Sequence, residues 1–222
     1  LFRSARTAAV VMLATAGGCL SPRGDAPPMH TYQLSLDTAS GEGRPADVTG
    51  SVLLVGQPQP HPGFESPRMV YLKRPYELEF YATNQWTDSP ARLFAPLLVQ
   101  SLSQTGTWRA VVALPGSVRG DYRLDSSGFI VQQEFLRQPS LVRMALRGQL
   151  VDLKESRVVS TKLFEVEEPA PSEDAYGGVL ASNRAAAAML AQITSWLQSC
   201  ADRKSTRLNS SHRCISYAVF CL

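Results

Sequence analysis

The alternation of apolar and polar side chains is most informative between residues 68 and 98, where we expect the domain core to be built. Apolar side chains recur at every second position over residues 69–71 and again over residues 76–80, which is the period of a half-buried strand. The polar step Lys73-Arg74-Pro75 lies between the two runs and is typical of a turn. The pattern therefore predicts a β-hairpin.

A helix is predicted to follow this hairpin. Asp88 or Ser89 can cap its N-terminus, and Pro90 suits the first helical position, where a backbone N–H would have no partner. The leucines that follow share one helical stripe and are expected to face the core. They are Leu93, Leu97, Leu98 and Leu102.

Shorter apolar runs predict further strands on either side of this stretch. Residues 32–36, 48–55 and 108–114 each have the length and apolar character of a strand. Residues 121–135 are predicted to form two strands joined by a turn at Ser126-Ser127-Gly128, because Ser and Gly are common turn residues.

A long antiparallel hairpin is predicted between residues 140 and 168. Apolar positions alternate strictly over residues 140–150, the chain turns over residues 152–157, and a second strand returns over residues 158–168. Arg143 and Arg147 fall on the opposite face of the first strand from its apolar side chains. We interpret them as a solvated sheet face rather than an anion-binding site.

A closing helix is predicted after Pro169-Ala170-Pro171, which ends the sheet. Ser172 can cap this helix, and Glu173 and Asp174 would then lie in its first turn, near the positive end of the helix dipole. Small side chains at residues 185–188 would allow it to approach the sheet closely. Its apolar stripe comprises Val179, Ala186, Met189, Leu190, Ile193 and Leu197.

The first residues have the layout of an export signal. Two arginines precede an apolar run that is too short to span a bilayer, and small residues follow. Ala16-Gly17-Gly18-Cys19 resembles a bacterial lipobox, in which the cysteine thiol is diacylated and becomes the new N-terminus. It departs from the commonest pattern because Ala16 stands where Leu is usual. The alternative is an ordinary secretory signal that contains a cysteine.

We accordingly expect residues 1–18 to be a signal peptide and residues 19–30 to be the lipidated Cys19 with a polar, proline-rich linker. Two or three acyl chains on one cysteine would give stable attachment to a membrane. Leu20 is no inner-membrane retention signal by the sorting rule for such lipoproteins, so an outer-membrane anchor facing the periplasm is expected. Residues 31–200 would form the folded domain.

The last segment, residues 202–222, resembles the translation of a sequencing adapter and is left out of the fold prediction. It holds four Lys or Arg and one Asp, so residues 1–201 have 18 basic and 18 acidic side chains and no net charge. This balance gives no indication of nucleic-acid binding. Only Cys19 and Cys200 remain, so we do not expect a disulfide framework.

The sequence lacks the motifs of the common catalytic sites. It has no phosphate-binding loop, no G-x-S-x-G elbow, no H-E-x-x-H helix and no C-x-x-C pair. His61 stands in a proline-rich loop, and we interpret it as solvated. Glu77 and Glu79 could approach each other, but hydrated surface carboxylates explain them equally well. We expect no enzymatic activity, no cofactor and no metal site.

Several short elements occur in a recognisable order along the chain. They are Gly63-Phe64-Glu65-Ser66 with Arg68 and Tyr71, Tyr81-Ala82-x-Asn84-x-Trp86 with Pro90, Tyr122-Arg123-Leu124, Asn183-Arg184 and Trp196-Leu197. In these elements the chain resembles the ABC-type transport auxiliary lipoproteins from about Tyr32 to Leu197. The Tyr-x-x-Asn-x-Trp segment, inside a chain with a lipobox, is the most specific of them.

This resemblance implies a periplasmic α/β domain, with antiparallel hairpins in a mixed β-sheet and two main helices packed on it. It also implies partners: a substrate-binding subunit with a mammalian-cell-entry (MCE) domain and, through it, an ABC permease and its ATPase. Such systems move phospholipids between the two membranes of a Gram-negative envelope. The chain would dock the tunnel-forming subunit at the outer membrane, and the family supplies no catalytic residues.

Other roles stay open at this point. One alternative is a periplasmic carrier lipoprotein that binds a phospholipid or its acyl chain, and weaker ones are a structural envelope lipoprotein or a hydrolase. Homo-oligomers are compatible with any of them. Tyr81 and Trp86 likewise admit two interpretations: aromatic side chains at strand ends either pack in the core or anchor a partner interface.

Overall fold

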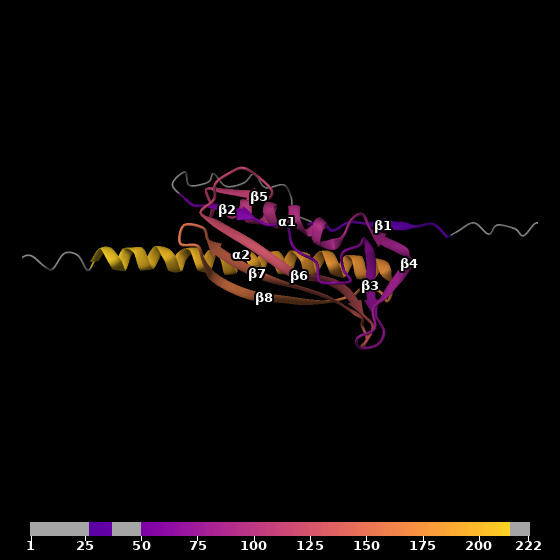
Figure 1. Cartoon of the computed structure of the whole chain (residues 1–222). Coiled ribbons are helices and arrows are strands. Elements are labelled where there is room, and N and C mark those ends of the chain that lie inside the picture. The colour runs from indigo at the N-terminus through magenta and orange to yellow at the C-terminus, as the bar shows by residue number, and fades with distance from the viewer. Residues whose placement is uncertain (1–26, 37–49, 214–222) are drawn as a thin grey trace, which may run out of the picture.

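The fold is a single α/β domain with a mixed, eight-stranded sheet and two helices, which confirms the predicted fold class. The structure is a computed structural model that describes residues 27–36 and 50–213 (Figure 1). Its elements, in chain order, are β1 (His30–Tyr32), β2 (Val52–Val55), β3 (Arg68–Leu72), β4 (Glu79–Trp86), α1 (Pro90–Gln104), β5 (Ala110–Ala113), β6 (Tyr122–Glu134), β7 (Leu141–Asp152), β8 (Arg157–Pro169) and α2 (Ala175–Arg213).

The long strand β6 organises the sheet. It pairs with β7 in antiparallel fashion along its length, and β7 pairs in the same way with β8. On the other edge of β6, β2 runs parallel to its first residues and β3 runs parallel to its last residues. Between these two strands, the N–H groups of Gly56, Gln59 and His61 each donate a 2.9 Å hydrogen bond to carbonyl oxygens of β6. Two arms, β2 with β5 and β3 with β4 and β1, therefore extend from one edge of β6 (Figure 1).

The predicted hairpin is present, but its second strand begins later than expected. β3 and β4 pair in antiparallel fashion, and β4 starts at Glu79 instead of Tyr76. Tyr76 lies in the connection with a left-handed backbone (φ 68°) and is fully exposed. The alternation of Tyr76 and Leu78 thus belongs to a loop, because the chain needs these residues to reverse direction. β4 continues instead to Trp86, where it pairs with β1.

The first helix begins at the predicted residue and buries a slightly different stripe. Pro90 occupies its first turn after Ser89, although the hydroxyl of Ser89 makes no capping hydrogen bond. The stripe that enters the core comprises Phe94, Leu98 and Leu102, none of them more than 1% exposed. Of the predicted stripe, Leu93 and Leu97 lie at its edge and are only half-buried.

Four strand predictions needed correction. The predicted turn at Ser126-Ser127-Gly128 is wrong, because β6 is continuous and accommodates the extra residue in a bulge before Ile130, where Gly128 has φ 68°. Pairing on both edges keeps β6 within the sheet through this point. β2 and β5 are shorter than predicted, and β1 lies just before the predicted strand at residues 32–36.

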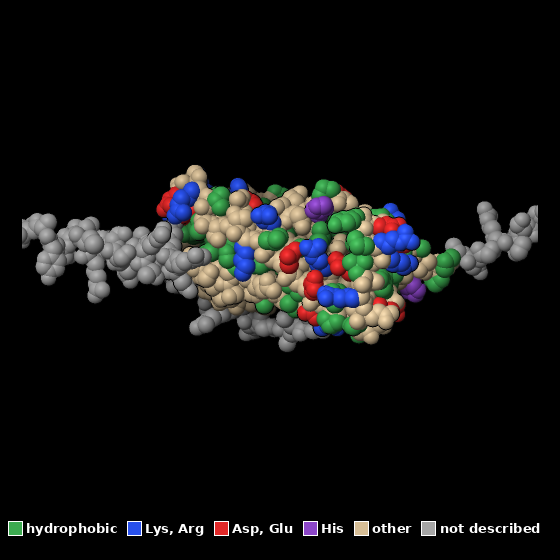
Figure 2. Space-filling model, turned by 90° about the horizontal axis from the view of Figure 1, so that it is seen from below, with side chains coloured by type: hydrophobic (Ala, Val, Ile, Leu, Met, Phe, Trp, Pro, Cys, Tyr) green, Lys and Arg blue, Asp and Glu red, His purple; other side chains and the backbone are tan. Residues whose placement is uncertain are grey.

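The predicted hairpin of β7 and β8 is confirmed, as is its solvated face. Val142, Met144 and Leu146 are at most 1% exposed on the face that α2 covers. On the other face, Arg143 forms a 2.5 Å ion pair with Glu165, and Arg147 is exposed. Figure 2 shows basic and acidic side chains intermixed over the face that it presents.

The closing helix α2 packs along β7 and β8 with its predicted apolar stripe. Its start differs from the prediction: α2 begins at Ala175, so Glu173 and Asp174 precede its first turn. The carboxylate of Asp174, rather than Ser172, caps the helix by accepting a 2.7 Å hydrogen bond from the N–H of Gly177. The backbone stays helical to Arg213, which is past the start of the segment at residue 202 that was left out of the fold prediction.

Both helices lie on the same side of the sheet and share its main hydrophobic core. α1 contacts α2 as well as β5 and β6, and the core cluster includes residues from both helices. A small second cluster of Phe64, Val70 and Leu72 lies under the loop on the opposite face of β3. At one end of the sheet, β3, β4 and β6 meet the start of α2.

Candidate functional site

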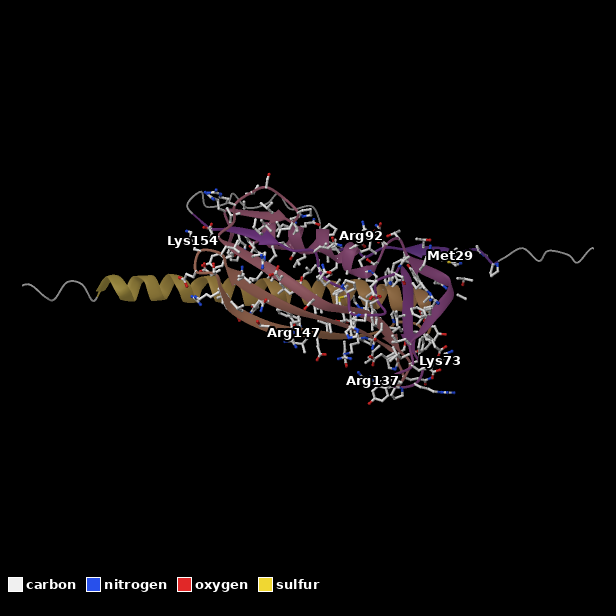
Figure 3. All side chains as sticks on the ribbon, in the orientation of Figure 1. Met29, Lys73, Arg92, Arg137, Arg147 and Lys154 are labelled. Carbon is white, nitrogen blue, oxygen red and sulfur yellow. The ribbon has the colours of Figure 1, made fainter. Side chains whose placement is uncertain are left out.

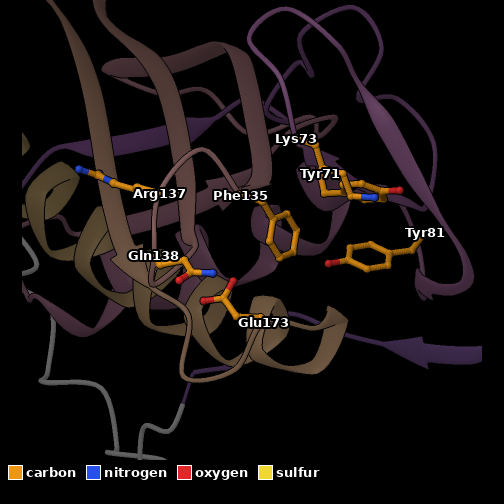
Figure 4. A pocket seen from close by; sticks show the side chains of 7 residues that line it. All are labelled: Tyr71, Lys73, Tyr81, Phe135, Arg137, Gln138 and Glu173. Carbon is orange, nitrogen blue, oxygen red and sulfur yellow. The ribbon is translucent and has the colours of Figure 1, made fainter.

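A pocket of about 440 Å³ opens where β3, β4, the end of β6 and the start of α2 meet (Figure 4). We call it the Tyr81 pocket. Its lining residues are Tyr71, Lys73, Tyr81, Phe135, Arg137, Gln138 and Glu173. Tyr71 comes from β3 and Tyr81 from β4, whereas Phe135 directly follows β6 and Glu173 lies two residues before α2.

Three aromatic rings form one wall of this pocket. The ring centroids of Tyr71 and Tyr81 lie 4.6 Å apart, and that of Phe135 lies 5.9 Å from Tyr71 at an interplanar angle of 89°. The register of the β3–β4 hairpin explains the contact between Tyr71 and Tyr81. Tyr71 pairs with Glu79, so Tyr81 is the diagonal neighbour of Tyr71 and lies within reach of its ring. The hydroxyl of Tyr71 also donates a 2.7 Å hydrogen bond to Glu79.

A chain of hydrogen bonds supports the pocket from behind. The hydroxyl of Tyr81 donates to Oε1 of Gln133 at 2.9 Å, and Nε2 of Gln133 donates to the hydroxyl of Ser140 at 3.0 Å. The backbone N–H of Ser140 then donates to the carboxylate of Glu173 at 2.8 Å. Gly178 on α2 makes room for this network, since a Cβ atom there would lie 2.3 Å from Oε1 of Gln133.

The charged side chains at the rim are balanced. The ammonium of Lys73 lies 5.1 Å from the centroid of the Tyr71 ring and 3.9 Å from the carboxylate of Glu79. The guanidinium of Arg137 forms a 2.6 Å ion pair with Glu167 and points away from the aromatic rings in Figure 4. The pocket thus offers aromatic faces and hydrogen-bonding groups rather than a concentrated charge.

The two phenols of the pocket are held in their protonated form. Burial raises the pKa of Tyr81 most, and the negative charges that Tyr71, Asp174 and Glu173 can carry raise it further. The hydrogen bond to Glu79 is the main cause that raises the pKa of Tyr71. At neutral pH both groups therefore act as hydrogen-bond donors, and neither is suited to act as a base.

The aromatic residues singled out from the sequence lie in different surroundings. Trp86 is 2% exposed and belongs to the hydrophobic core, so a partner cannot reach it in this structure. Tyr81 is half-buried, packs against that core and presents its hydroxyl end to the pocket. Cys19, the predicted lipidation residue, lies outside the described residues, as does the signal peptide.

The other candidates from the sequence do not gather into a site. His61 is exposed in its loop, with its ring 6.1 Å from that of Phe64. Glu77 pairs with Arg74 while Glu79 pairs with Tyr71, so these two carboxylates serve different partners. Within residues 27–36 and 50–201, no three His, Cys, Asp or Glu side chains are placed to hold a metal ion.

Sequence reasoning missed the residues that support the pocket: the polar residues Gln133 and Ser140, and Gly178, which leaves room for them. A signal for one of them was available. Two successive glycines, Gly177 and Gly178, stand at the start of a predicted helix, where glycine is unfavourable and usually marks a close approach. Gln133 and Ser140 carried no comparable signal, since their other partners, Tyr81 and Glu173, are distant in the sequence.

A family model described as the ABC-type transport auxiliary lipoprotein component matches residues 32–194. The chain belongs to this family. The matched segment contains every element of the fold except most of β1 and the end of α2. The description names a lipoprotein that is an auxiliary component of a transport system, and lipoproteins reside at the cell envelope.

Solved structures show a similar fold at low sequence identity. Protein XCC0632 from Xanthomonas campestris is 19% identical, with a TM-score of 0.64 over 81% of this chain and 97% of that one. An uncharacterized protein of known structure is 16% identical, with a TM-score of 0.58 over 77% of this chain and 99% of that one. A comparison with curated proteins finds no match. In the described part of this family member, no helix is long and apolar enough to cross a membrane.

Proposed function

We propose that this chain is a membrane-anchored periplasmic lipoprotein and a non-enzymatic auxiliary component of an MCE-linked ABC system for lipid transport. The observation that carries the proposal is the family match over residues 32–194, which begins 13 residues after the lipobox cysteine Cys19. An acylation signal followed by an auxiliary domain is the arrangement that a tethered accessory protein requires.

The tether limits how far the domain can move from its membrane. Cys19 and the first strand residue, His30, are 11 residues apart, so the linker reaches at most about 40 Å when fully extended. Acyl chains on Cys19 would hold the domain at the periplasmic face of the outer membrane. ATP hydrolysis would take place on the permease-associated ATPase and not on this chain.

Docking of the MCE-domain subunit is proposed to use the Tyr81 pocket. Aromatic side chains that line a concave surface are effective anchoring points for a partner. Tyr76 is fully exposed on the loop between β3 and β4, and it places a further aromatic side chain next to the strands that form the pocket. Because the charges at the rim balance, the pocket suits a protein surface with little net charge better than a highly charged surface.

Fractionation of cells tests the anchor. Cys19→Ser removes the only thiol in the lipobox, so the protein should move from the membrane fraction to the soluble fraction. Cys200→Ser is the matched control because Cys200 is buried at the end of the described side chains of α2, and this variant should stay with the membrane. Retention of Cys19→Ser in the membrane would contradict lipid anchoring.

Co-purification with the neighbouring transporter subunits tests the docking role. Gln138→Trp would fill the pocket from an exposed position, and it should reduce recovery of the MCE-domain subunit at least tenfold. Gln192→Trp, at an exposed position on α2, is the control and should leave recovery unchanged. Absence of the transporter subunits from the wild-type sample would instead favour a purely structural envelope role.

A further inference from the structure

One charged side chain of the Tyr81 pocket lacks an opposite charge. The two cations of the lining, Lys73 and Arg137, lie at the same end of the molecule (Figure 3), and each pairs with a carboxylate outside the lining, at 3.9 Å and 2.6 Å. Glu173 is the third charged residue of the lining, and it forms no ion pair with a side chain of residues 27–36 or 50–201. The pocket therefore holds one negative charge that the described residues do not compensate.

The carboxylate of Glu173 can also accept further hydrogen bonds. Its Oε1 atom accepts the 2.8 Å bond from the backbone N–H of Ser140, and no group of the described residues donates to Oε2. The hydroxyls of Tyr71 and Tyr81 cannot supply this bond, because both already donate to other side chains. A ligand in the pocket can therefore donate an N–H group to a carboxylate.

The aromatic wall of the pocket favours a cation as well. Figure 4 shows the carboxylate of Glu173 pointing from the α2 side toward Phe135, with the hydroxyl end of Tyr81 nearby. The face of an aromatic ring is negative and attracts cations. One such contact is already present, since the ammonium of Lys73 lies 5.1 Å from the centroid of the Tyr71 ring. The rings and the carboxylate thus attract the same kind of group.

We infer that the Tyr81 pocket receives a basic side chain, lysine or arginine, from the protein that docks there. Ammonium and guanidinium groups combine a positive charge for the rings with N–H donors for Glu173. A quaternary ammonium group has no N–H and would leave this carboxylate without a hydrogen bond. The methylenes of either side chain can lie against the ring of Phe135. The docking protein is that of the proposed function, on which this inference rests.

The charges at the rim limit how basic the docking surface can be. The side chains of Lys73 and Arg137 are positive and mostly exposed. A surface with many cations would be repelled by them, whereas one basic side chain would pair with Glu173 inside the pocket. The docking protein is therefore expected to carry a single basic side chain on an otherwise nearly neutral surface.

Saturation-transfer NMR with the full-length lipoprotein in a nonionic detergent tests this chemistry without the partner. The probes are N-acetyl-arginine amide and N-acetyl-citrulline amide, which have nearly the same shape but differ in charge. The arginine probe should receive saturation at its side-chain methylenes and bind about tenfold more tightly than the citrulline probe. Equal binding of the two probes to the wild type would overturn the inference, because contact without charge would then be sufficient.

Matched variants assign the effect to the pocket. Glu173→Gln keeps an oxygen for the N–H of Ser140 and removes the charge, so affinity for the arginine probe should fall about tenfold. Glu165→Gln removes an exposed carboxylate from β8, outside the pocket lining, and should leave affinity unchanged. Phe135→Leu keeps an apolar side chain without a π face and should lower affinity about fivefold. Wild-type affinity in both pocket variants would overturn the inference.

Capture of the MCE-domain subunit separates this inference from the docking proposal. Loss of capture in Gln138→Trp and Glu173→Gln, with Glu165→Gln unaffected, would support both. Loss in Gln138→Trp alone would leave the docking role in place and refute the basic side chain. Full capture by Gln138→Trp and Glu173→Gln would overturn docking at this pocket and, with it, the assignment of the cation to a docking protein, even if the arginine probe still binds.

Discussion

The hydroxyl of Tyr81 on β4 donates a 2.9 Å hydrogen bond to the side-chain amide of Gln133 on β6, across 52 residues of sequence. Gln133 in turn donates a hydrogen bond to the hydroxyl of Ser140, and the backbone N–H of Ser140 donates one to Glu173 beside α2. The start of β4 and the segment just before α2 lie on opposite sides of the Tyr81 pocket (Figure 4). This network therefore fixes the shape of the pocket as much as the aromatic rings do.

Removal of the Tyr81 hydroxyl tests that conclusion. Tyr81→Phe keeps the ring contact with Tyr71 but leaves the Gln133 amide without its donor, so the free energy of unfolding should fall by about 1 kcal/mol. Chemical denaturation measures the loss. Tyr176→Phe is the control: its ring is 53% exposed on α2, and the change should be within error. Equal stability of both variants would show that the network contributes nothing.

Ser126 is expected to respond in the opposite direction. Its hydroxyl is buried in β6, and it finds no hydrogen-bond partner among the described residues. Ser126→Ala removes an unpaired polar group, so the free energy of unfolding should rise by about 1 kcal/mol. Ser140→Ala is the matched comparison, because the equally buried Ser140 accepts a hydrogen bond from Gln133, and this variant should be destabilised. A destabilised Ser126→Ala variant would reveal a partner for the hydroxyl.

Much of the fold was predictable because some segments carry strict periods. The two-residue period of β7 and the helical stripe of α2 come from burial against one large core, so local sequence and final packing agree. The bulge at Gly128 was not predictable in this way. Ser and Gly suit a turn and a bulge equally well, and the choice depends on pairing with β7 and with residues 56–61, which are distant in the sequence.

The Tyr81 pocket was only partly predictable, for a similar reason. Tyr81 attracted attention through the family resemblance, yet its neighbours Phe135 and Glu173 come from segments more than 50 residues later. No local pattern brings these residues together; the register of β3, β4 and β6 does. Trp86, five residues after Tyr81, had the same two interpretations and lies in the core instead.

Acid sensitivity should depend in part on Asp121. Its carboxylate accepts a 2.8 Å hydrogen bond from the N–H of Val52 and pairs with Lys154 at 3.2 Å. The backbone hydrogen bond to Val52 is the main cause that lowers the pKa of Asp121 below its usual range. A carboxyl group with a lowered pKa in the folded state stabilises the protein above the unfolded-state pKa, and this contribution is lost as the pH falls through the folded-state pKa.

The variant Asp121→Asn makes this dependence measurable. The wild type should be the more stable protein at pH 7, and the difference in unfolding free energy should shrink as the pH falls below about 4. Urea denaturation between pH 7 and pH 2.5 gives both curves. A difference that stays constant over this range would mean that the charge of Asp121 has no part in stability.

Trp86 provides the strongest expected effect on stability. Its indole is 2% exposed in the main core cluster, at the end of β4 where β1 pairs and just before α1 begins. Trp86→Ala would leave a large cavity, so the free energy of unfolding should fall by about 3–5 kcal/mol. Tyr76→Ala removes another large aromatic side chain from a fully exposed position and should change stability by less than about 0.5 kcal/mol. A Trp86→Ala protein as stable as the wild type would contradict the packing role of this indole.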